Sequence, residues 1–309
     1  ITIGMGKTEK LEITYEPTNA TYKDITWSTS NATIATVENG TITGKKAGTA
    51  TITATSTKNA NIKAECNITV EEIIEISTVE ELKAFRDDVN NGNTYYGKKI
   101  ILTNDLNLNQ GKYTVASDGT VTFNEDAEQW TAIGTNTNHF VGNFDGQGHT
   151  ISGLYINKPT EHYQGLFGYS GGLGTDMKYI KNIVLKDINI QCANNSGGIS
   201  GYVSNYNINK CAVYGNIIGN SIKSGASTSM SYVGGIFGVL DNSTVTNCYN
   251  HSSVTAVGVT PAYAGGIAAS AKNSFILNCY NSGDIIGQAE LGGICGYVDK
   301  NAEIEYCYN

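Results

Sequence analysis

The 309-residue chain is poor in proline, in charged side chains and in long apolar runs. It contains 3 prolines, and only 16% of its residues are charged. No apolar run approaches the length of a membrane-spanning helix, and no signal peptide is recognisable, so we expect no membrane insertion in this segment. The net charge of −8 argues against nucleic acid and anionic membranes as partners, because both bind basic surfaces.

Sequence motifs for metal, nucleotide or nucleophilic chemistry are also missing. The histidines form no H-E-x-x-H, no C-x-x-C is present, and no glycine-rich fingerprint opens a helix. We therefore expect no metal, no cofactor and no catalytic residue. The histidines are scattered at His139, His149, His162 and His251.

Glycine and alternating apolar residues are abundant instead. The chain holds 36 glycines, and 40% of its residues are hydrophobic. Regular alternation with many tight turns is typical of an all-β protein and argues against disorder.

Residues 1–71 alternate apolar residues with Thr or Ser, which predicts a small β-sandwich. Their motifs resemble the bacterial Ig-like domains of group 2, and the resemblance covers nearly the whole module. It implies a spacer or adhesive module without catalytic residues. The family's usual first strand looks clipped at Ile1. The matching segments are Glu16-Pro17-Thr18-Asn19-Ala20, Thr26-Trp27-Ser28-Thr29-Ser30-Asn31, Ile34-Ala35-Thr36-Val37, Asn39-Gly40 and Lys46-Ala47-Gly48-Thr49-Ala50-Thr51-Ile52.

The second domain, residues 72–309, is predicted to begin with one helix at about residues 78–91. Ser77 followed by Glu80 has the pattern of a capping box, so Ser77 is the expected N-cap. Val79, Leu82, Phe85 and Val89 fall on one face. A single amphipathic helix before a repeat array is expected to cap its open apolar end.

Two motifs, G-G-I-x-G and N-C-Y, recur in the second half of the chain. The cysteine lies 13 positions after the second glycine in three successive copies. Fixed internal spacing predicts structural units that stack into a solenoid. The glycine–cysteine pairs are Gly198 and Cys211, Gly235 and Cys248, and Gly266 and Cys279.

These repeats, together with an earlier stretch, resemble the GLUG-motif β-helical proteins of bacterial surfaces over roughly residues 75–309. The earlier stretch includes Trp130-Thr131-Ala132-Ile133-Gly134, Phe140-Val141-Gly142-Asn143-Phe144 and Gly165-Leu166-Phe167-Gly168. The resemblance implies a right-handed, single-stranded parallel β-helix; right-handed crossovers are also the general preference. The expected fold is thus all-β, an Ig-like β-sandwich followed by this solenoid with its capping helix.

Stacking the units places Cys211, Cys248, Cys279 and Cys307 in one column, with Ile183 one unit earlier. Exchange of isoleucine with cysteine indicates an inward, apolar position. A wall of stacked thiols lacks the tetrahedral arrangement that zinc prefers. We therefore predict a structural ladder of buried free thiols.

Tyrosines follow these cysteines, and asparagines follow the tyrosines. Tyr249 and Tyr280 should point outward, and with Asn250 and Asn281 they could hold a sugar face. In the alternative interpretation, which we favour, the tyrosines cover a turn and the asparagines form a hydrogen-bonded ladder. The long excursion at residues 221–232, which ends at Tyr232, is a second candidate binding element.

A β-helical polysaccharide-degrading enzyme is the main alternative. Asp241 and Asp299 share a turn column two rungs apart, and Lys272 occupies the rung between them. That lysine would keep both carboxylates ionised, whereas glycoside hydrolysis needs one protonated acid.

The expected function is that of an extracellular bacterial protein, on the cell surface or secreted, acting as an adhesin or stalk. The expected partner is a glycan or a host surface protein, and a structural spacer that binds nothing is a third alternative. Because the repeat pattern is interrupted at Asn309, we expect further domains of the same longer chain.

Overall fold

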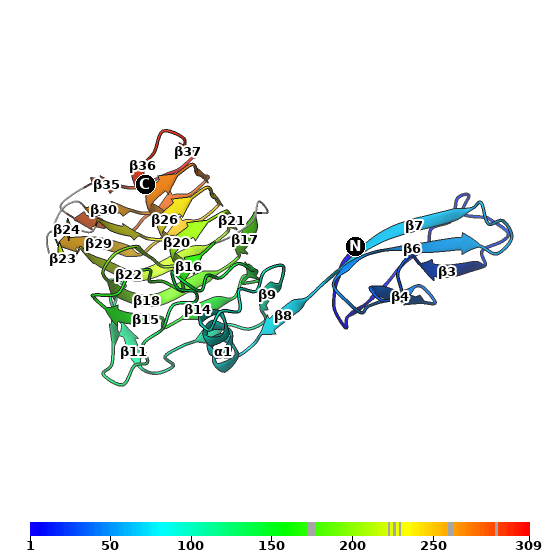
Figure 1. Cartoon of the computed structure of the whole chain (residues 1–309), viewed down its shortest axis with the longest axis horizontal. Helices are drawn as coiled ribbons and strands as arrows, with labels where there is room; N and C mark the ends of the chain where they lie inside the picture. Colours follow the sequence, from blue (N-terminus) through cyan, green and yellow to red (C-terminus); the bar gives the residue numbers. More distant parts are fainter. Residues whose placement is uncertain (172–176, 222, 225–226, 229, 259–261, 288–289) are drawn as a thin grey trace. The chain divides into compact units, whose positions relative to one another are not determined.

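The computed structural model describes all residues except 172–176, 222, 225–226, 229, 259–261 and 288–289 (Figure 1). The chain divides into two compact units, Ile1–Ile74 and Glu75–Asn309. The division lies three residues beyond the expected boundary at residue 71. It falls inside strand β8 (Ile73–Ile76), so the connecting segment is extended chain.

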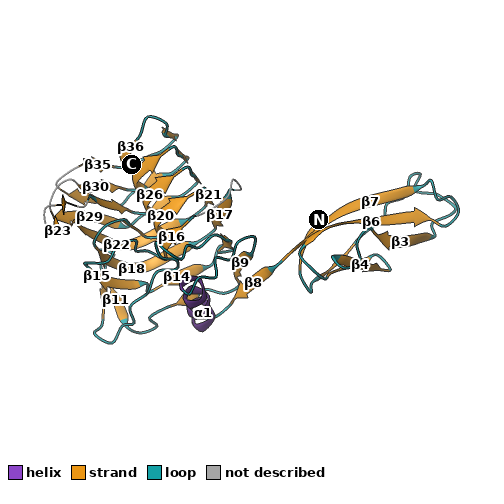
Figure 2. Cartoon of the chain, viewed as in Figure 1, coloured by secondary structure: helices purple, strands orange, loops and turns teal. Residues whose placement is uncertain are grey.

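The first unit is a β-sandwich of two sheets (Figure 2). Alternation places the apolar residues between the sheets, where Ile42, Ile52 and Ile68 are buried against Trp27. This core is small, since it draws on few strands. The four-stranded sheet has β1 (Thr2–Gly4), β7 (Lys63–Glu71), β6 (Gly48–Ser56) and β3 (Ile25–Thr29), and the three-stranded sheet has β2 (Thr8–Lys10), β5 (Thr41–Gly44) and β4 (Ala35–Glu38).

The second unit is a solenoid of stacked parallel strands, visible as layered arrows in Figure 1. Each complete turn of the chain passes through four sheets, here called sheets 1 to 4. Sheet 1 begins with β8 and continues with β9 (Lys99–Leu102), β13 (Asn143–Asp145), β17 (Lys178–Lys181), β21 (Tyr206–Asn209), β27 (Thr244–Thr246), β32 (Phe275–Leu277) and β37 (Glu303–Glu305). Sheet 2 has β10 (Leu106–Asn107), β14 (Thr150–Ser152), β15 (Tyr155–Lys158), β18 (Val184–Cys192), β22 (Ala212–Ser221), β28 (Tyr249–Asn250), β29 (Ser253–Gly258), β33 (Tyr280–Asn281) and β34 (Ile285–Gly287).

Sheets 3 and 4 complete each rung. Sheet 3 has β16 (Phe167–Ser170), β20 (Ser200–Ser204), β26 (Phe237–Asp241), β31 (Ala268–Lys272) and β36 (Cys295–Val298). Sheet 4 has β19 (Ser196–Gly197), β25 (Ser231–Gly234), β30 (Ala262–Gly265) and β35 (Glu290–Gly292). The strand order along the chain is sheet 4, then 3, 1 and 2, so the G-G-I motif forms the corner between sheets 4 and 3.

Left-handed residues turn the chain at the corner between sheets 1 and 2. Asn182, Asn247 and Asn278 have φ of 55°, 54° and 51°. Asparagine tolerates this region better than most residues because its short amide bonds the local backbone. Lys210 before Cys211 and Tyr306 before Cys307 also have φ of 53°, so this corner favours asparagine without requiring it.

The helix α1 (Val79–Asn90) covers the N-terminal end of the solenoid. Its N-cap is Thr78, and Glu81 closes the capping box; the expectation of Ser77 and Glu80 is wrong by one residue. Ser77 instead donates to the Glu81 carboxylate at 2.8 Å. Phe85 packs edge-on against Phe140, with ring centroids 5.6 Å apart, and this contact holds α1 against the buried aromatic residues of the core.

The two repeated motifs meet inside the solenoid. A Cβ on Gly235 would lie 2.3 Å from Cγ of Asn250, and one on Gly266 would lie equally close to Cγ of Asn281. The asparagine amide therefore fills the space that the missing glycine side chain leaves on the opposite wall of the same rung. This packing gives a physical reason for the fixed spacing between G-G-I and N-C-Y.

One hairpin leaves the solenoid wall. Strands β11 (Tyr113–Val115) and β12 (Val121–Phe123) pair antiparallel, and the segment between them contains Asp118-Gly119. Strands β23 (Lys223–Ser224) and β24 (Ser227–Thr228) also pair antiparallel.

Candidate functional site on the outer face of sheet 2

Tyrosines form an exposed column along one edge of sheet 2. Tyr249 pairs with Tyr280 in the parallel register, and Tyr280 bridges to Tyr308. Their exposed fractions are 44%, 37% and 68%. The column therefore presents aromatic surface to solvent at successive rungs.

A second aromatic column lies beside the first. The Tyr214 ring stacks on the His251 ring, with centroids 4.6 Å apart and 13° between the planes. His251 also meets the edge of Tyr280 at 5.9 Å. Partial burial lowers the pKa of His251, so its imidazole is predominantly neutral at neutral pH. Together with the tyrosine column, these rings form an uncharged aromatic strip at neutral pH.

Asn250 and Asn281 are not part of that exposed strip. Both are buried, with 0% and 1% exposure. The Asn250 amide nitrogen donates to Oδ1 of Asn281 at 2.7 Å, and that of Asn281 donates to Oδ1 of Asn309 at 2.7 Å. The prediction that these two asparagines bind a ligand is therefore corrected. They form the internal hydrogen-bonded ladder of the alternative interpretation.

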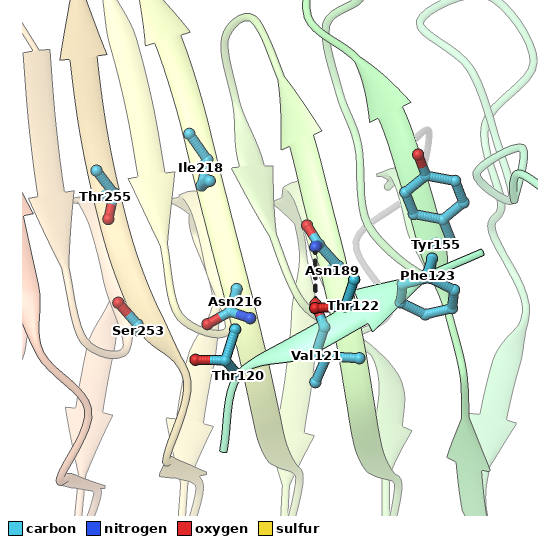
Figure 3. Close-up of a pocket in the computed structure, with 10 residues that line it drawn as sticks. All are labelled: Thr120, Val121, Thr122, Phe123, Tyr155, Asn189, Asn216, Ile218, Ser253 and Thr255. Carbon is cyan, nitrogen blue, oxygen red and sulfur yellow. Dashed lines mark hydrogen bonds between the residues drawn. The ribbon is translucent and has the colours of Figure 1, made fainter. Parts of the chain in front are cut away.

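A cleft of about 450 Å³ lies on the same outer face, between sheet 2 and the β11–β12 hairpin (Figure 3). Figure 3 shows β12 crossing the strands, with Thr120 near Asn216, Val121 near Asn189, and Phe123 over Tyr155. The Asn189 amide donates to the Val121 carbonyl oxygen at 3.2 Å. The Phe123 and Tyr155 rings stack with centroids 4.7 Å apart, and these two contacts hold the hairpin on the sheet.

The floor of the cleft is a column of short polar side chains. The register aligns Tyr155 with Asn189, Asn189 with Asn216, and Asn216 with Ser253. Ile218 and Thr255 form the neighbouring column. All ten lining residues are uncharged: Thr120, Val121, Thr122, Phe123, Tyr155, Asn189, Asn216, Ile218, Ser253 and Thr255.

Sequence reasoning missed this cleft. The strand alternation of residues 212–221 and 253–258 indicates which side chains face outward. The position of the hairpin over them depends on tertiary contacts, such as the hydrogen bond at 3.2 Å from the Tyr113 hydroxyl to Asp187. No local pattern encodes that contact.

Tyr232, the other predicted site residue, lies on sheet 4 and away from the aromatic strip. Its ring stacks on Tyr263, with centroids 5.2 Å apart and 8° between planes. Burial, and then the neighbouring Tyr263, raise the pKa of Tyr232. The excursion at 221–232 includes residues 222, 225–226 and 229, which lie outside the described residues.

The cysteine column faces the interior. Cys211, Cys248 and Cys279 are fully buried, Cys307 is partly buried, and all four are free thiols. The Cys211 amide lies 3.4 Å from Sγ of Cys248, and the Cys279 amide lies 3.4 Å from Sγ of Cys307. Burial raises the pKa of Cys248, which keeps that thiol protonated.

The acidic residues considered for catalysis serve as structural acceptors. Asp241 pairs with Lys272 in the register and accepts a hydrogen bond from the Tyr202 hydroxyl at 3.0 Å. The Asp299 carboxylate accepts a hydrogen bond from the backbone N–H of Asn301 at 2.9 Å. Among the described residues, no group of three or more His, Cys, Asp or Glu side chains is arranged to hold a metal ion.

Within the described part of the chain, no helix is long and apolar enough to cross a membrane.

The family match lies in the first unit. Residues 1–68 match the family model of the bacterial Ig-like domain (group 2), as the sequence motifs predict. The chain is 52% identical over 63 residues to an alpha-L-arabinofuranosidase of Bifidobacterium longum, a match that covers 20% of this chain and 6% of that protein. It is 37% identical over 67 residues to an uncharacterized protein of Clostridium acetobutylicum, covering 21% of this chain and 7% of that one.

A putative Gly-rich membrane protein of Evansella cellulosilytica is 44% identical over 45 residues, covering 15% of this chain and 5% of that protein. The matched segments thus span less than a tenth of the length of these relatives. Among solved structures, an IgA1 protease aligns with 84% of this chain and 22% of its own, at 17% identity and a TM-score of 0.37. A likeness this weak supports no argument about function. The first unit is a bacterial Ig-like domain, joined to a solenoid of stacked parallel sheets.

Proposed function

We propose that this chain is part of an extracellular bacterial protein, on the cell surface or secreted, that binds a glycan through the outer face of sheet 2. The observation that carries the proposal is the aromatic strip, in which Tyr249, Tyr280 and Tyr308 stay exposed at successive rungs. Exposed aromatic surface on a rigid scaffold is typical of interaction sites, and tyrosine combines a flat apolar ring with a hydroxyl.

The Ig-like unit supports the extracellular part of the proposal. Domains of this group occur in bacterial surface proteins and in glycoside hydrolases, and the Bifidobacterium longum relative is an arabinofuranosidase. That match covers only the Ig-like region, so the hydrolase activity is not transferred to this chain.

The alternative functions make different predictions. A polysaccharide-degrading enzyme needs two carboxylates flanking the bond, one of them protonated. Asp241 lies beside Lys272 of the next rung, and its carboxylate accepts a hydrogen bond from the Tyr202 hydroxyl, so it is engaged within the protein. A pure spacer would bind nothing. If the partner is a host protein, the chain would bind it in the absence of any carbohydrate.

The test is retention on immobilised polysaccharides and mucins, with chain length measured on the same samples. We expect retention without shortening, and loss of about tenfold in affinity for Tyr249→Ala with Tyr280→Ala, since two stacking contacts are removed. Tyr22→Ala is the matched control, because Tyr22 is 65% exposed on the Ig-like unit. Shortened chains would favour the enzyme, and no retention would contradict glycan binding.

A further inference from the structure

We propose that the hairpin cleft on sheet 2 is the subsite that selects the ligand, and that it takes an uncharged, hydroxyl-rich polysaccharide. This inference rests on the proposed function and deepens it. The aromatic strip offers stacking surface to many sugars, whereas the cleft offers polar side chains in an open concave space between the hairpin and the sheet.

Most polar side chains of the cleft floor have unused hydrogen-bonding capacity. The Asn189 amide nitrogen already holds the Val121 carbonyl oxygen, so part of its capacity is used within the protein. The side chains of Asn216, Ser253 and Thr255 make no hydrogen bond to any residue in the described part of the chain, and all three are partly exposed within the cleft. An amide and two hydroxyls can both donate and accept, which matches sugar hydroxyls.

The absence of charge in the cleft favours an uncharged ligand. None of its lining residues is charged. On the strands beneath it, Lys158 pairs with Glu161 at 3.2 Å, and Lys186 is exposed but does not line the cleft. Asp187 and the exposed Asp284 lie next along the strands. An anionic sugar would therefore find no cation among the lining residues to pair with its charge, and a half-buried charge without a partner is unfavourable.

The polar side chains of the cleft floor repeat from rung to rung. Asn189, Asn216 and Ser253 come from successive rungs, which lie about 4.8 Å apart. A chain lying along the solenoid axis would meet one polar side chain at each rung. The Phe123–Tyr155 stack closes the cleft at its N-terminal end.

The experiment compares the 309-residue chain with three variants on two classes of probe. The uncharged probes are mannan, galactan, xylan and β-glucan, and the anionic probes are polygalacturonate and hyaluronan. Asn216→Ala removes the free amide, and Ser253→Phe fills the cleft. Asn207→Ala is the control, because Asn207 is an exposed asparagine on β21 of the same rung but on sheet 1. Thermal melting establishes that each variant is folded.

We expect retention on at least one uncharged probe, with affinity lowered about tenfold by Asn216→Ala and by Ser253→Phe and unchanged by Asn207→Ala. Preference for an anionic probe, or full retention by both cleft variants, would overturn the cleft proposal while leaving glycan binding in place. If the unmodified chain is retained on none of the probes, both proposals fail. If Ser253→Phe does not fold, Asn216→Ala alone decides.

Discussion

The strands of the two units are paired in different ways. In the Ig-like unit, all pairings but that of β1 with β7 are antiparallel, and each residue of the core faces different neighbours. In the solenoid, the stacked strands are parallel, and a residue meets its own structural equivalent one rung above and below.

The difference determines how each unit responds to substitution. The Ig-like unit has a single core around Ile42, Ile52 and Ile68, in which volume is the main constraint. In the solenoid, the backbones of successive rungs pass so close together at some glycines that no side chain fits there. The same kind of mutation should therefore be tolerated in one unit and not in the other.

The largest expected effect separates two glycines. Gly235→Ala places a Cβ 2.2 Å from the Gly266 carbonyl oxygen, a backbone atom that cannot move without shifting the next rung. We expect a loss of at least about 3 kcal/mol in the free energy of unfolding. In Gly4→Ala, the nearest atom is Cδ1 of Ile73 at 3.1 Å, the end of a flexible side chain. That variant should lose less than about 1 kcal/mol, and chemical denaturation of both variants measures the difference.

Equal losses for these two glycine variants would contradict the view that the stacked backbones restrict the solenoid more than the sandwich.

The next effect distinguishes neighbouring residues within one rung. Asn250→Ala removes the donor to Asn281 and the acceptor of the Ser252 amide, both inside the solenoid. Leaving such buried groups without partners should cost about 2 to 4 kcal/mol. Tyr249→Ala changes an exposed side chain and should cost about 0.5 kcal/mol. Thermal unfolding of the two variants tests the contrast, and a tyrosine effect as large as the asparagine effect would argue against the buried ladder.

A thiol experiment compares the cysteines of the two units. Cys192, Cys211, Cys248 and Cys279 are buried in the solenoid, whereas Cys66 of the Ig-like unit is partly exposed. Burial raises the pKa of Cys192 to about 12, so little thiolate forms at pH 8. In an alkylation time course followed by mass spectrometry, Cys66 should react early and the four buried cysteines only after unfolding.

In denaturant, all seven cysteines should react, because all are free thiols. Fewer than seven would reveal a disulfide and contradict the ladder of free thiols.

The smallest expected effect is a pH dependence of the solenoid. Because the folded-state pKa of His251 is lowered, the unfolded chain binds more protons as pH falls through its ordinary value of about 6.5. The stability from the neutral ring is therefore present above pH 6.5 and declines below it. The melting temperature should fall slightly between pH 7.5 and pH 5.5, and His251→Gln should remove that part of the slope. An unchanged slope would show that His251 is not responsible.

Much of the solenoid could be predicted from its repeats. The spacing of G-G-I and N-C-Y indicated stacked rungs, and exchange of Ile183 with cysteine indicated the buried column. The helix was predicted to within one residue at each end, but its cap was not. Ser77 with Glu80 and Thr78 with Glu81 both have the capping-box spacing, and in the structure the second pair forms the box.

The right-handed crossover and the resemblance to GLUG-motif proteins stay predictions.

The sequence by itself determined the elements whose information is local or repeated: the alternating strands, the amphipathic helix, the rungs and the Ig-like motifs. Tertiary structure decided what each face is used for. It turned Asn250 inward, because Gly235 on the opposite wall leaves room for an amide. It also made the cleft, because Asn189 and Tyr155 hold a hairpin that is 32 or more residues earlier in the chain. Contacts between distant segments depend on the closed path of the chain, which no short pattern records.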